Sequence, residues 1–366
     1  MRKVAIVTLN YNGLTILKDK LFECIDSLFN LRYPRYDVII VDNGSTDESF
    51  DAIRNRYGND AFLIKLKHNY GFTGGNILGL EKYIRAKHIP DYVLLVNNDF
   101  KITNQEFLNE VIKFLERKRS IGIAQGINLL YHSNRIDSAG AFITNIRGLL
   151  RFSGFRLSEY PEKTSYISYA VGSCIVLKYR FITSYRDLIF TPYYFAYWEE
   201  AELSLDLWRK GIKSVVLPVL AGEHLGGITF KEKPILRDYL KLRNEIWTLK
   251  KHVEGILRLY MAPSILNITL PLIYRPLQRF KGKILTRALT DGFFIKPYKC
   301  LRKYPYYPLI IIIKSWKVIP HSTPGFLKYK VFKHFIQDVE SKISVLIIDD
   351  DQLKSSQRPW LISINL

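Results

Sequence analysis

Four polar segments each follow a short apolar run in the first hundred residues, and this repetition limits the folds open to the chain. The apolar runs are rich in β-branched residues and alternate with stretches of helical periodicity, which predicts an α/β sandwich with a largely parallel sheet. The expected strands are Val4–Leu9, Val38–Val41, Phe62–Leu66, Tyr92–Val96, Ile121–Ala124, Gly172–Leu177 and Ser214–Leu217. The expected helices are Leu14–Phe29, Asp47–Tyr57, Asn76–Arg85, Gln105–Arg119, Glu200–Lys210 and Arg237–His252.

The polar segments are Thr8–Gly13, Asp42–Asp47, Asn69–Asn76 and Asn97–Asp99. Any one of them, taken alone, is typical of an ordinary turn followed by a helix cap. In a parallel sheet, however, the carboxyl ends of the strands lie along one edge, where ligands bind. Four polar segments at the same edge therefore favour a binding site.

The residue types at this edge suit a nucleoside diphosphate and a metal ion. Asp42 can accept hydrogen bonds from a base or ribose, and Gly74 and Gly75 allow backbone amides to approach ribose or phosphate. Asp99 is suited to Mg²⁺ or Mn²⁺, which bind to one or two carboxylates together with substrate phosphates. The glycine-rich turn of a dinucleotide-binding fold and the phosphate loop of nucleotide triphosphatases are both missing from the sequence.

The acidic residues Glu199, Glu200 and Glu202 open a predicted helix. Acidic side chains in a first helical turn commonly do no more than complement the helix dipole. They are also the candidates for a general base, which the strand-end residues do not supply. Spacing alone leaves both readings open.

Read together, the four polar segments resemble glycosyltransferase family 2, and in particular its rhamnosyltransferase-like branch. The resemblance covers about residues 3–253 and, more weakly, extends to 298. It implies a GT-A type, Rossmann-like sandwich and inverting transfer from a nucleoside diphosphate sugar. It assigns Thr8, Asn10 and Asp42 to the nucleoside, Asn69 and Asn76 to the donor neighbourhood, and Asp99 to a divalent metal, Mg²⁺ or Mn²⁺. Gly74, Gly75 and Asn97 are also expected to contribute to donor binding.

The same resemblance extends to the later residues. Glu199 and Glu200 stand where the family has an acidic pair containing the base, which implies that Glu200 is the base. His224 matches a histidine near the diphosphate and the metal. The segment Tyr239–Asn244 also resembles the family, and its arginine is expected either to reach a phosphate or to form a surface salt bridge.

Three departures from the family pattern are visible. Asn97 replaces the first acidic residue of the D-x-D motif, and Glu200 replaces the usual aspartate. The expected G-x-F-D-E sequence before the acidic pair is absent. The acceptor side of the site is therefore less closely matched than the donor side.

Charge divides the chain near residue 230. Residues 1–230 hold 29 basic and 24 acidic residues, whereas residues 231–366 hold 25 and 10. We expect a catalytic domain over 1–230 and a mainly helical, basic extension over 231–366. The longest uncharged stretch, Leu259–Tyr274, is shorter than the ~20 residues of a membrane span, so the extension is expected to associate with an anionic membrane surface without crossing it.

Three widely spaced cysteines and an N-terminal apolar run of only six residues predict a cytoplasmic protein at the inner face of the cell membrane. The expected acceptor is a lipid-linked or surface glycan, and no nucleic-acid partner is expected. Two alternatives remain open. A sugar nucleotidyltransferase would share the fold and the metal but needs a glycine- and arginine-rich loop after the first strand, and a non-catalytic membrane- or polyanion-binding protein would need no intact site.

Overall fold

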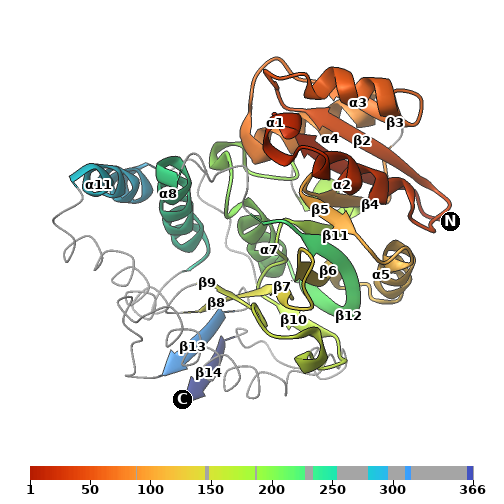
Figure 1. Ribbon diagram of the computed structural model, residues 1–366. Coiled ribbons are helices and arrows are strands. Elements are labelled where there is room, and N and C mark those ends of the chain that lie inside the picture. Colours follow the sequence, from red (N-terminus) through yellow and green to blue (C-terminus); the bar gives the residue numbers. More distant parts are fainter. Residues whose placement is uncertain are drawn as a thin grey trace.

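A ten-stranded sheet forms the centre of the molecule (Figure 1). The computed structural model describes residues 1–87, 89–144, 148–185, 188–226, 234–253, 279–295, 310–314 and 361–365. The main path of the sheet runs β10-β12-β6-β11-β4-β1-β2-β3, with β5 paired to β12 and β7 paired to β6. The strands are β1 Val4–Asn10, β2 Tyr36–Asp42, β3 Ala61–Lys65, β4 Tyr92–Val96, β5 Phe100–Ile102, β6 Ile121–Leu130, β7 Ile136–Ser138, β10 Ser165–Ile167, β11 Cys174–Lys178 and β12 Lys213–His224.

The sheet is parallel where the polar segments follow its strands. β1 pairs in parallel with β2 and β4, and β2 pairs in parallel with β3. β11 then runs antiparallel to both β4 and β6, while β6 and β12 are parallel. Because β11 runs backwards, its first residues lie beside the end of β4, and the backbone of Asn97 donates to the carbonyl of Ser173 at 3.0 Å. The predicted α/β class is confirmed, and β11 adds chain to the binding edge.

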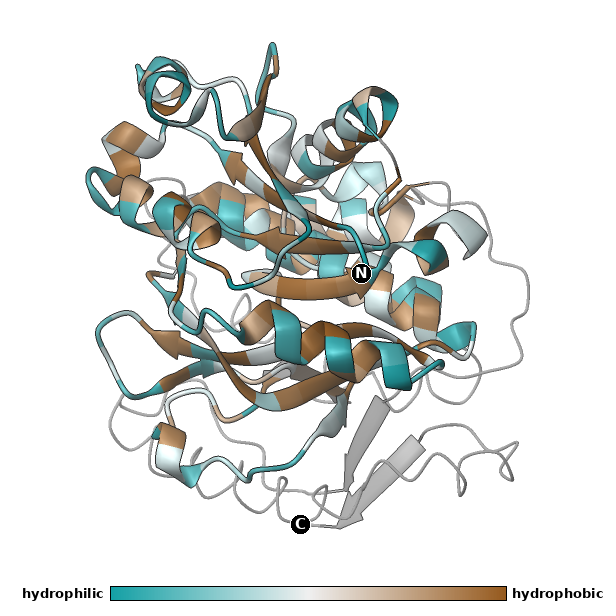
Figure 2. Cartoon of the chain, turned by 90° about the vertical axis from the view of Figure 1, so that its right-hand side faces the viewer, coloured by the Kyte–Doolittle hydropathy of each residue, from teal (hydrophilic) through white to brown (hydrophobic). Residues whose placement is uncertain are grey.

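Helices pack on both faces of this sheet. They are α1 Gly13–Leu17, α2 Lys20–Phe29, α3 Ser49–Tyr57, α4 Gly71–Ala86, α5 Phe107–Arg117, α6 Tyr179–Tyr185 and α7 Glu199–Arg209. The strands between them are almost wholly apolar and buried, and Figure 2 shows them as the most hydrophobic layer of the molecule. Burial on both faces explains why these strands appear in the sequence as continuous apolar runs.

The single helix expected over Leu14–Phe29 is wrong, because the chain forms two helices there. Lys18 has a φ of 54°, which ends α1, and α2 begins at Lys20. A left-handed residue cannot continue a right-handed helix. The break turns α2 so that Leu21, Ile25 and Leu28 are buried in the main core.

A second, four-stranded sheet has the order β14-β13-β8-β9. It joins β8 Ala141–Thr144 and β9 Gly148–Leu150 to β13 Ile310–Lys314 and β14 Leu361–Asn365. The apolar run at 310–313 in the basic extension forms strand β13. Since β13 pairs with β8, chain from beyond residue 300 is hydrogen-bonded to the first 150 residues.

Two further helices, α8 Pro234–His252 and α11 Arg279–Phe294, lie side by side at the edge of the molecule (Figure 1). Tyr239 donates to the Asp291 carboxylate at 2.6 Å, and the Trp247 indole donates to the Asp291 carbonyl at 3.1 Å. Within the described residues, no helix combines the length and apolar character that crossing a bilayer requires. The expected boundary at residue 230 and the helical character of the rest of the extension stay predictions, since much of 231–366 lies outside the described residues.

Gly79 sets how closely α4 approaches β2. A Cβ atom at this position would lie 2.5 Å from Cγ2 of Val41, closer than two carbon atoms can approach. We expect Gly79→Val to push α4 away from the sheet and to destabilise the protein by about 1–3 kcal/mol. Lys82→Val, an exposed position on the same helix, is the control. Urea unfolding measures both, and equal stability of the two variants would contradict the close packing of α4.

Candidate functional site

A cavity of about 310 Å³ opens at the carboxyl ends of β1, β2 and β4. Its wall joins strand ends, the start of α4, the start of β11, the start of α7 and the end of β12. The lining residues are Leu9, Tyr11, Asn43, Asn69, Gly71, Phe72, Asn97, Asn98, Asp99, Val171, Gly172, Ser173, Phe195, Ala196, Tyr197, Glu199, Glu200 and His224. The fold therefore brings the four polar segments and the predicted acidic pair to one cavity.

Asp42 and Asn10 form a buried pair at the ends of two parallel strands. They are register partners in β1 and β2, and the Asn10 amide donates to the Asp42 carboxylate at 3.0 Å. The backbone N–H of Ser45 donates to the other carboxylate oxygen at 3.1 Å. Thr8 is 1% exposed, and within the described residues its hydroxyl has no hydrogen-bond partner. These three residues are buried next to lining residues in the sequence, but none of them is among the residues that line the cavity.

The segment before α4 supports the cavity in two ways. Asn69 lines it and accepts a hydrogen bond from the backbone of Gly71 at 2.8 Å. Asn76 faces inward instead, since its amide donates to the Phe72 carbonyl at 2.9 Å and it is 2% exposed. A Cβ at Gly75 would lie 3.0 Å from Leu9 and 3.1 Å from Asn43, so this glycine permits close packing of α4 on the strand ends.

Gly74 stands apart from the cavity wall. The nearest atom to a Cβ at this position is the Cβ of Tyr70, at 2.8 Å. Gly74, Gly75 and Asn76 are not among the residues that line the cavity within the described chain. Their roles in donor binding stay predictions.

Asp99 and His224 face each other across the end of β4. The His224 Nε2 lies 3.3 Å from the Asp99 carboxylate, and its Nδ1 lies 3.0 Å from the carboxylate of Asp137. Burial lowers the pKa of His224, but the two carboxylates raise it more, to about 10. Asp137, at the start of β7, was not found from the sequence, because no strand was expected there.

The residues at this point fit a divalent metal. Asp99 is 5% exposed, and the buried His224 Nε2 has no hydrogen-bond partner within the described chain. A carboxylate and an imidazole facing one cavity are two suitable ligands, and a diphosphate and water commonly complete such a shell. No group of three or more acidic, cysteine or histidine side chains among the described residues converges as a metal site, so this pair would depend on the substrate's phosphates.

Glu199 and Glu200 begin α7 and line the opposite wall. Burial and the neighbouring carboxylate raise the pKa of Glu199 well above its usual value. Burial also raises the pKa of Glu200, whereas a backbone hydrogen bond from Gly172 opposes the rise. Within the described residues, one carboxylate oxygen of each has no hydrogen-bond partner. Acidic residues that only stabilise the helix dipole do not need to be buried. Their burial therefore favours the interpretation that the pair belongs to a functional site.

Arg243 occupies neither of the two places expected for it. Its guanidinium donates to the carbonyls of Tyr193 and Tyr194, each at 3.2 Å, and lies over the Trp247 ring at 4.2 Å. The segment it contacts leads into Glu199 and supplies three lining residues, Phe195, Ala196 and Tyr197. Sequence reasoning missed this segment because it lacks periodicity and departs from the family pattern.

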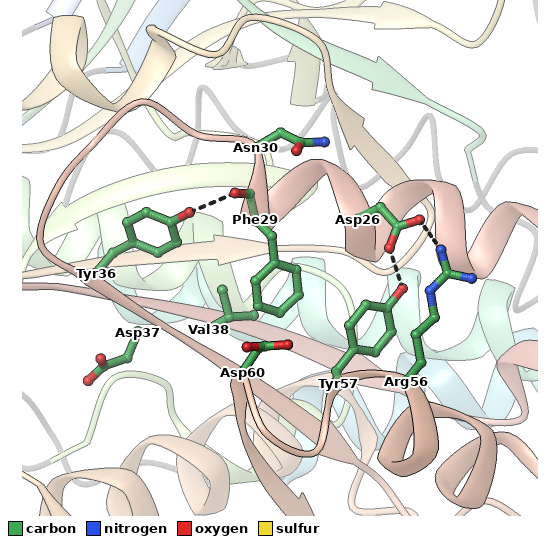
Figure 3. Close-up of a pocket in the computed structure, with 9 residues that line it drawn as sticks. All are labelled: Asp26, Phe29, Asn30, Tyr36, Asp37, Val38, Arg56, Tyr57 and Asp60. Atoms are coloured by element: carbon green, nitrogen blue, oxygen red, sulfur yellow. Dashed lines mark hydrogen bonds and ion pairs between the residues drawn. The ribbon is translucent and has the colours of Figure 1, made fainter.

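A second depression lies at the opposite edge of the sheet, where β2 begins (Figure 3). Its charged groups are paired locally: Asp26 accepts from Arg56 at 2.6 Å and from Tyr57 at 2.7 Å. None of the predicted site residues lines it. The strand-end cavity is therefore the candidate active site.

Comparison with known proteins identifies the class of the fold. The chain resembles GalNAc-T7, solved with UDP, GalNAc and Mn²⁺, at a TM-score of 0.53 and 11% identity, covering 79% of this chain and 55% of that one. A mannosyltransferase of Pyrobaculum calidifontis gives 0.48 at 15% identity, covering 80% and 75%, and residues 1–349 of S. aureus TarS give 0.49 at 15%, covering 79% and 80%. The mixed α/β architecture is that of GT-A glycosyltransferases.

Residues 4–181 match the model of glycosyl transferase family 2. The match covers just under half of the chain and supports its membership of that family. A comparison with curated protein sequences gives no significant match.

The raised pKa of Glu199 predicts a stability cost at neutral pH. Above the ordinary value of 4.5 the unfolded carboxyl loses its proton while the buried one keeps it, so rising pH increasingly favours unfolding. We expect Glu199→Gln to raise the unfolding free energy relative to the native chain above pH 4.5, and to give no gain below it. Denaturant unfolding across pH measures this, with Glu162→Gln, at an exposed position, as control. A gain that does not depend on pH would contradict the buried, protonated carboxyl.

Proposed function

We propose that the chain is an inverting glycosyltransferase that moves a sugar from a nucleoside diphosphate sugar to an acceptor hydroxyl. One observation carries the proposal: the buried Glu199 and the half-buried Glu200 share a cavity with the Asp99–His224 pair and the strand-end asparagines. The two groups of residues do different chemistry, and transfer to a hydroxyl needs both.

The strand ends would hold the donor. Asp42, oriented by Asn10 and Ser45, would accept hydrogen bonds from the nucleoside, and the hydroxyl of Thr8, unpartnered within the described residues, lies on the neighbouring strand β1. Asn97 and Asn69 line the cavity where the sugar would lie. GalNAc-T7 and the Pyrobaculum mannosyltransferase were solved with nucleotide ligands and Mn²⁺, which agrees with such a donor.

Asp99 and His224 would hold a divalent cation on the diphosphate. When bound, the cation supplies neutralisation of the charge that develops on the leaving diphosphate. The Asp137 carboxylate accepts from Nδ1 of His224, which fixes the ring with its Nε2 toward Asp99. Ring orientation by a second carboxylate is a common feature of histidine ligands.

Glu200 would act as the general base. Burial and the neighbouring carboxylate raise the pKa of Glu199 well above its usual value, whereas the hydrogen bond from the Gly172 backbone favours the ionised form of Glu200. Glu200 takes the proton of the acceptor hydroxyl, the hydroxyl oxygen bonds to the anomeric carbon, and the bond from that carbon to the diphosphate breaks. One displacement inverts the anomeric centre.

Incubation with a panel of nucleotide sugars, acceptor glycans and Mn²⁺ tests the proposal by release of nucleoside diphosphate, and the absence of release with every donor would overturn it.

Glu200→Gln keeps the shape of the side chain but removes its basicity. We expect turnover to fall by roughly 10²- to 10⁴-fold, with donor binding retained. Glu199→Gln is the matched variant one residue away, and it should cost less because Glu199 is the protonated member of the pair. If Glu199→Gln were damaging and Glu200→Gln harmless, the roles within the pair would be reversed.

Asp99→Asn removes the charge that would hold the cation. We expect the Mn²⁺-dependent part of nucleoside diphosphate affinity to fall by at least about tenfold, while metal-independent binding stays unchanged. Asp60→Asn, in the depression at the opposite edge of the sheet, is the control. Titration calorimetry with and without Mn²⁺ separates the two parts, and equal metal dependence in all three proteins would remove Asp99 from the metal site.

We also propose peripheral attachment to the inner face of the cell membrane, with a lipid-linked or surface glycan as acceptor and a relationship to the rhamnosyltransferase-like branch. Residues 240–335 hold 19 basic residues and only three acidic ones. At the end of α11, Phe293 and Phe294 are 38% and 82% exposed, and Ile295 is 48% exposed. Exposed apolar side chains among basic ones suit a membrane surface, where each Lys or Arg contributes about 1 kcal/mol.

Flotation with liposomes measures this attachment. The full chain should rise with anionic vesicles at low salt, less at high salt, and not with neutral vesicles, because salt screens the attraction between surface charges. A chain carrying Phe293→Ser and Phe294→Ser should rise less than the native chain at the same salt. Equal flotation with anionic and neutral vesicles would contradict an electrostatic attachment.

A further inference from the structure

The segment that delivers the two carboxylates is held in an unfavourable backbone conformation. Phe195, Tyr197 and Trp198 have φ angles of 66°, 70° and 72°, in the region that side chains other than glycine rarely adopt. α7 begins at the next residue, Glu199. Three of the four residues from 195 to 198 therefore have a positive φ. Such a conformation is stable only where surrounding contacts determine it.

Three of those contacts come from one side chain of α8. The Asn244 amide nitrogen donates to the carbonyls of Tyr194 at 2.9 Å, Ala196 at 2.9 Å and Tyr197 at 2.8 Å. Asn244 is 0% exposed, so these carbonyls lie in an interior where an unpaired polar group is costly. Its own carbonyl oxygen accepts from Arg243 at 2.9 Å, which orients the amide so that its nitrogen faces the segment.

Neighbouring residues of α8 hold the start of the same segment. Tyr194 is fully buried, and its hydroxyl lies 2.9 Å from that of Thr248. Its ring packs edge-on against Trp247, with the ring centroids 6.0 Å apart. Trp247 is fixed in turn by its bond to the Asp291 carbonyl of α11. On the other side, the backbone of Thr73 in α4 donates to the Phe195 carbonyl at 3.0 Å.

We propose that Asn244 is a positioning residue, which holds the strained segment 194–198 and thereby places Glu199 and Glu200 against the donor. This role rests on the proposed transferase function, although the clamp itself is independent of it. Asn244 is not itself among the lining residues, and it acts through the backbone that carries Phe195, Tyr197 and the two carboxyls. α8 is therefore part of the catalytic unit, although it lies beyond the basic boundary at residue 230.

The proposal predicts that Asn244 determines the position of the two carboxyls but not the affinity for the nucleotide. Asp42, Asn10 and Thr8 lie on β1 and β2, which Asn244 does not contact, so nucleotide binding is expected to survive its loss. The carboxyls depend on the segment for both place and burial. A misplacement of about 1 Å can lower turnover by about 10²-fold.

Asn244→Asp tests the clamp, since it keeps the side-chain shape and the oxygen that accepts from Arg243 but removes the donor. Ile246→Ala is the matched control: Ile246 is 2% exposed and packs between α8 and α11, so its loss destabilises the same helix without touching the segment. We expect amide exchange over 192–200 to be at least about tenfold faster in Asn244→Asp than in the native chain, and unchanged by Ile246→Ala.

Kinetic measurements on the same variants are the second test. In Asn244→Asp, kcat should fall by about 10²-fold, while the affinity for UDP or GDP with Mn²⁺ changes by less than about threefold. The acid limb of the kcat profile should move to lower pH, because hydration of the carboxyls removes the burial that raises their pKa. Ile246→Ala should lower the melting temperature and leave kcat and the pH profile unchanged. Equal loss of kcat in both variants would reduce Asn244 to a structural role and overturn the proposal.

The proposed transferase function and the proposed role of Asn244 can be contradicted independently of each other. If the native chain binds no nucleotide and transfers no sugar, the proposed function fails, and the exchange measurement alone judges the clamp. If the native chain is active and Asn244→Asp keeps native exchange and native kcat, the clamp fails and the transferase stands. Should Asn244→Asp not fold, Asn244→Ala removes the donor without placing a negative charge beside the carbonyls, and the same measurements apply.

Discussion

Asn10 and Asp42 end neighbouring parallel strands in register, and a hydrogen bond of 3.0 Å between their side chains joins the two strands at the edge where the cavity opens. Parallel pairing puts the carboxyl ends of β1, β2 and β4 at one edge, so every polar segment that follows them faces the same space. α4 packs close to this edge through Gly75 and Gly79, and it presents Asn69 beside Asn43. The donor side of the cavity is thus a consequence of sheet topology and of two glycines on one helix.

Buried charge is arranged in two different ways across the cavity. On one side His224 lies between Asp99 and Asp137, and opposite charges stabilise one another there. On the other side Glu199 and Glu200 are adjacent like charges under low exposure, which favours the protonated form of one of them. The first arrangement suits a cation and an anionic leaving group, and the second suits proton transfer. Stability is reduced at the carboxyl pair for the sake of its chemistry.

The basic extension serves more than one purpose in this structure. α8 contributes Asn244 and Arg243 to the segment before α7, and Lys251 forms an ion pair with Glu202 of α7. α11 packs on the outer side of α8 through Asp291 and Gly292. At the end of α11, Phe293, Phe294 and Ile295 remain exposed.

The sequence by itself determined the α/β class, most strand positions and the identity of the polar strand ends, because these depend on local periodicity and on turn chemistry. It also pointed to Glu199, Glu200, Asp99 and His224 through resemblance, and the fold brings all four to one cavity. It did not reveal the break at Lys18, the strands between 130 and 172, the partner role of Asp137 or the clamp of Asn244. Each of these depends on atoms far apart in the chain: Asn244 and Tyr194 are fifty residues apart, and Asp137 and His224 eighty-seven. Local propensity carries no information about such contacts, and only tertiary packing could decide them, because a strained φ or a buried amide is stable solely where distant groups pair with it.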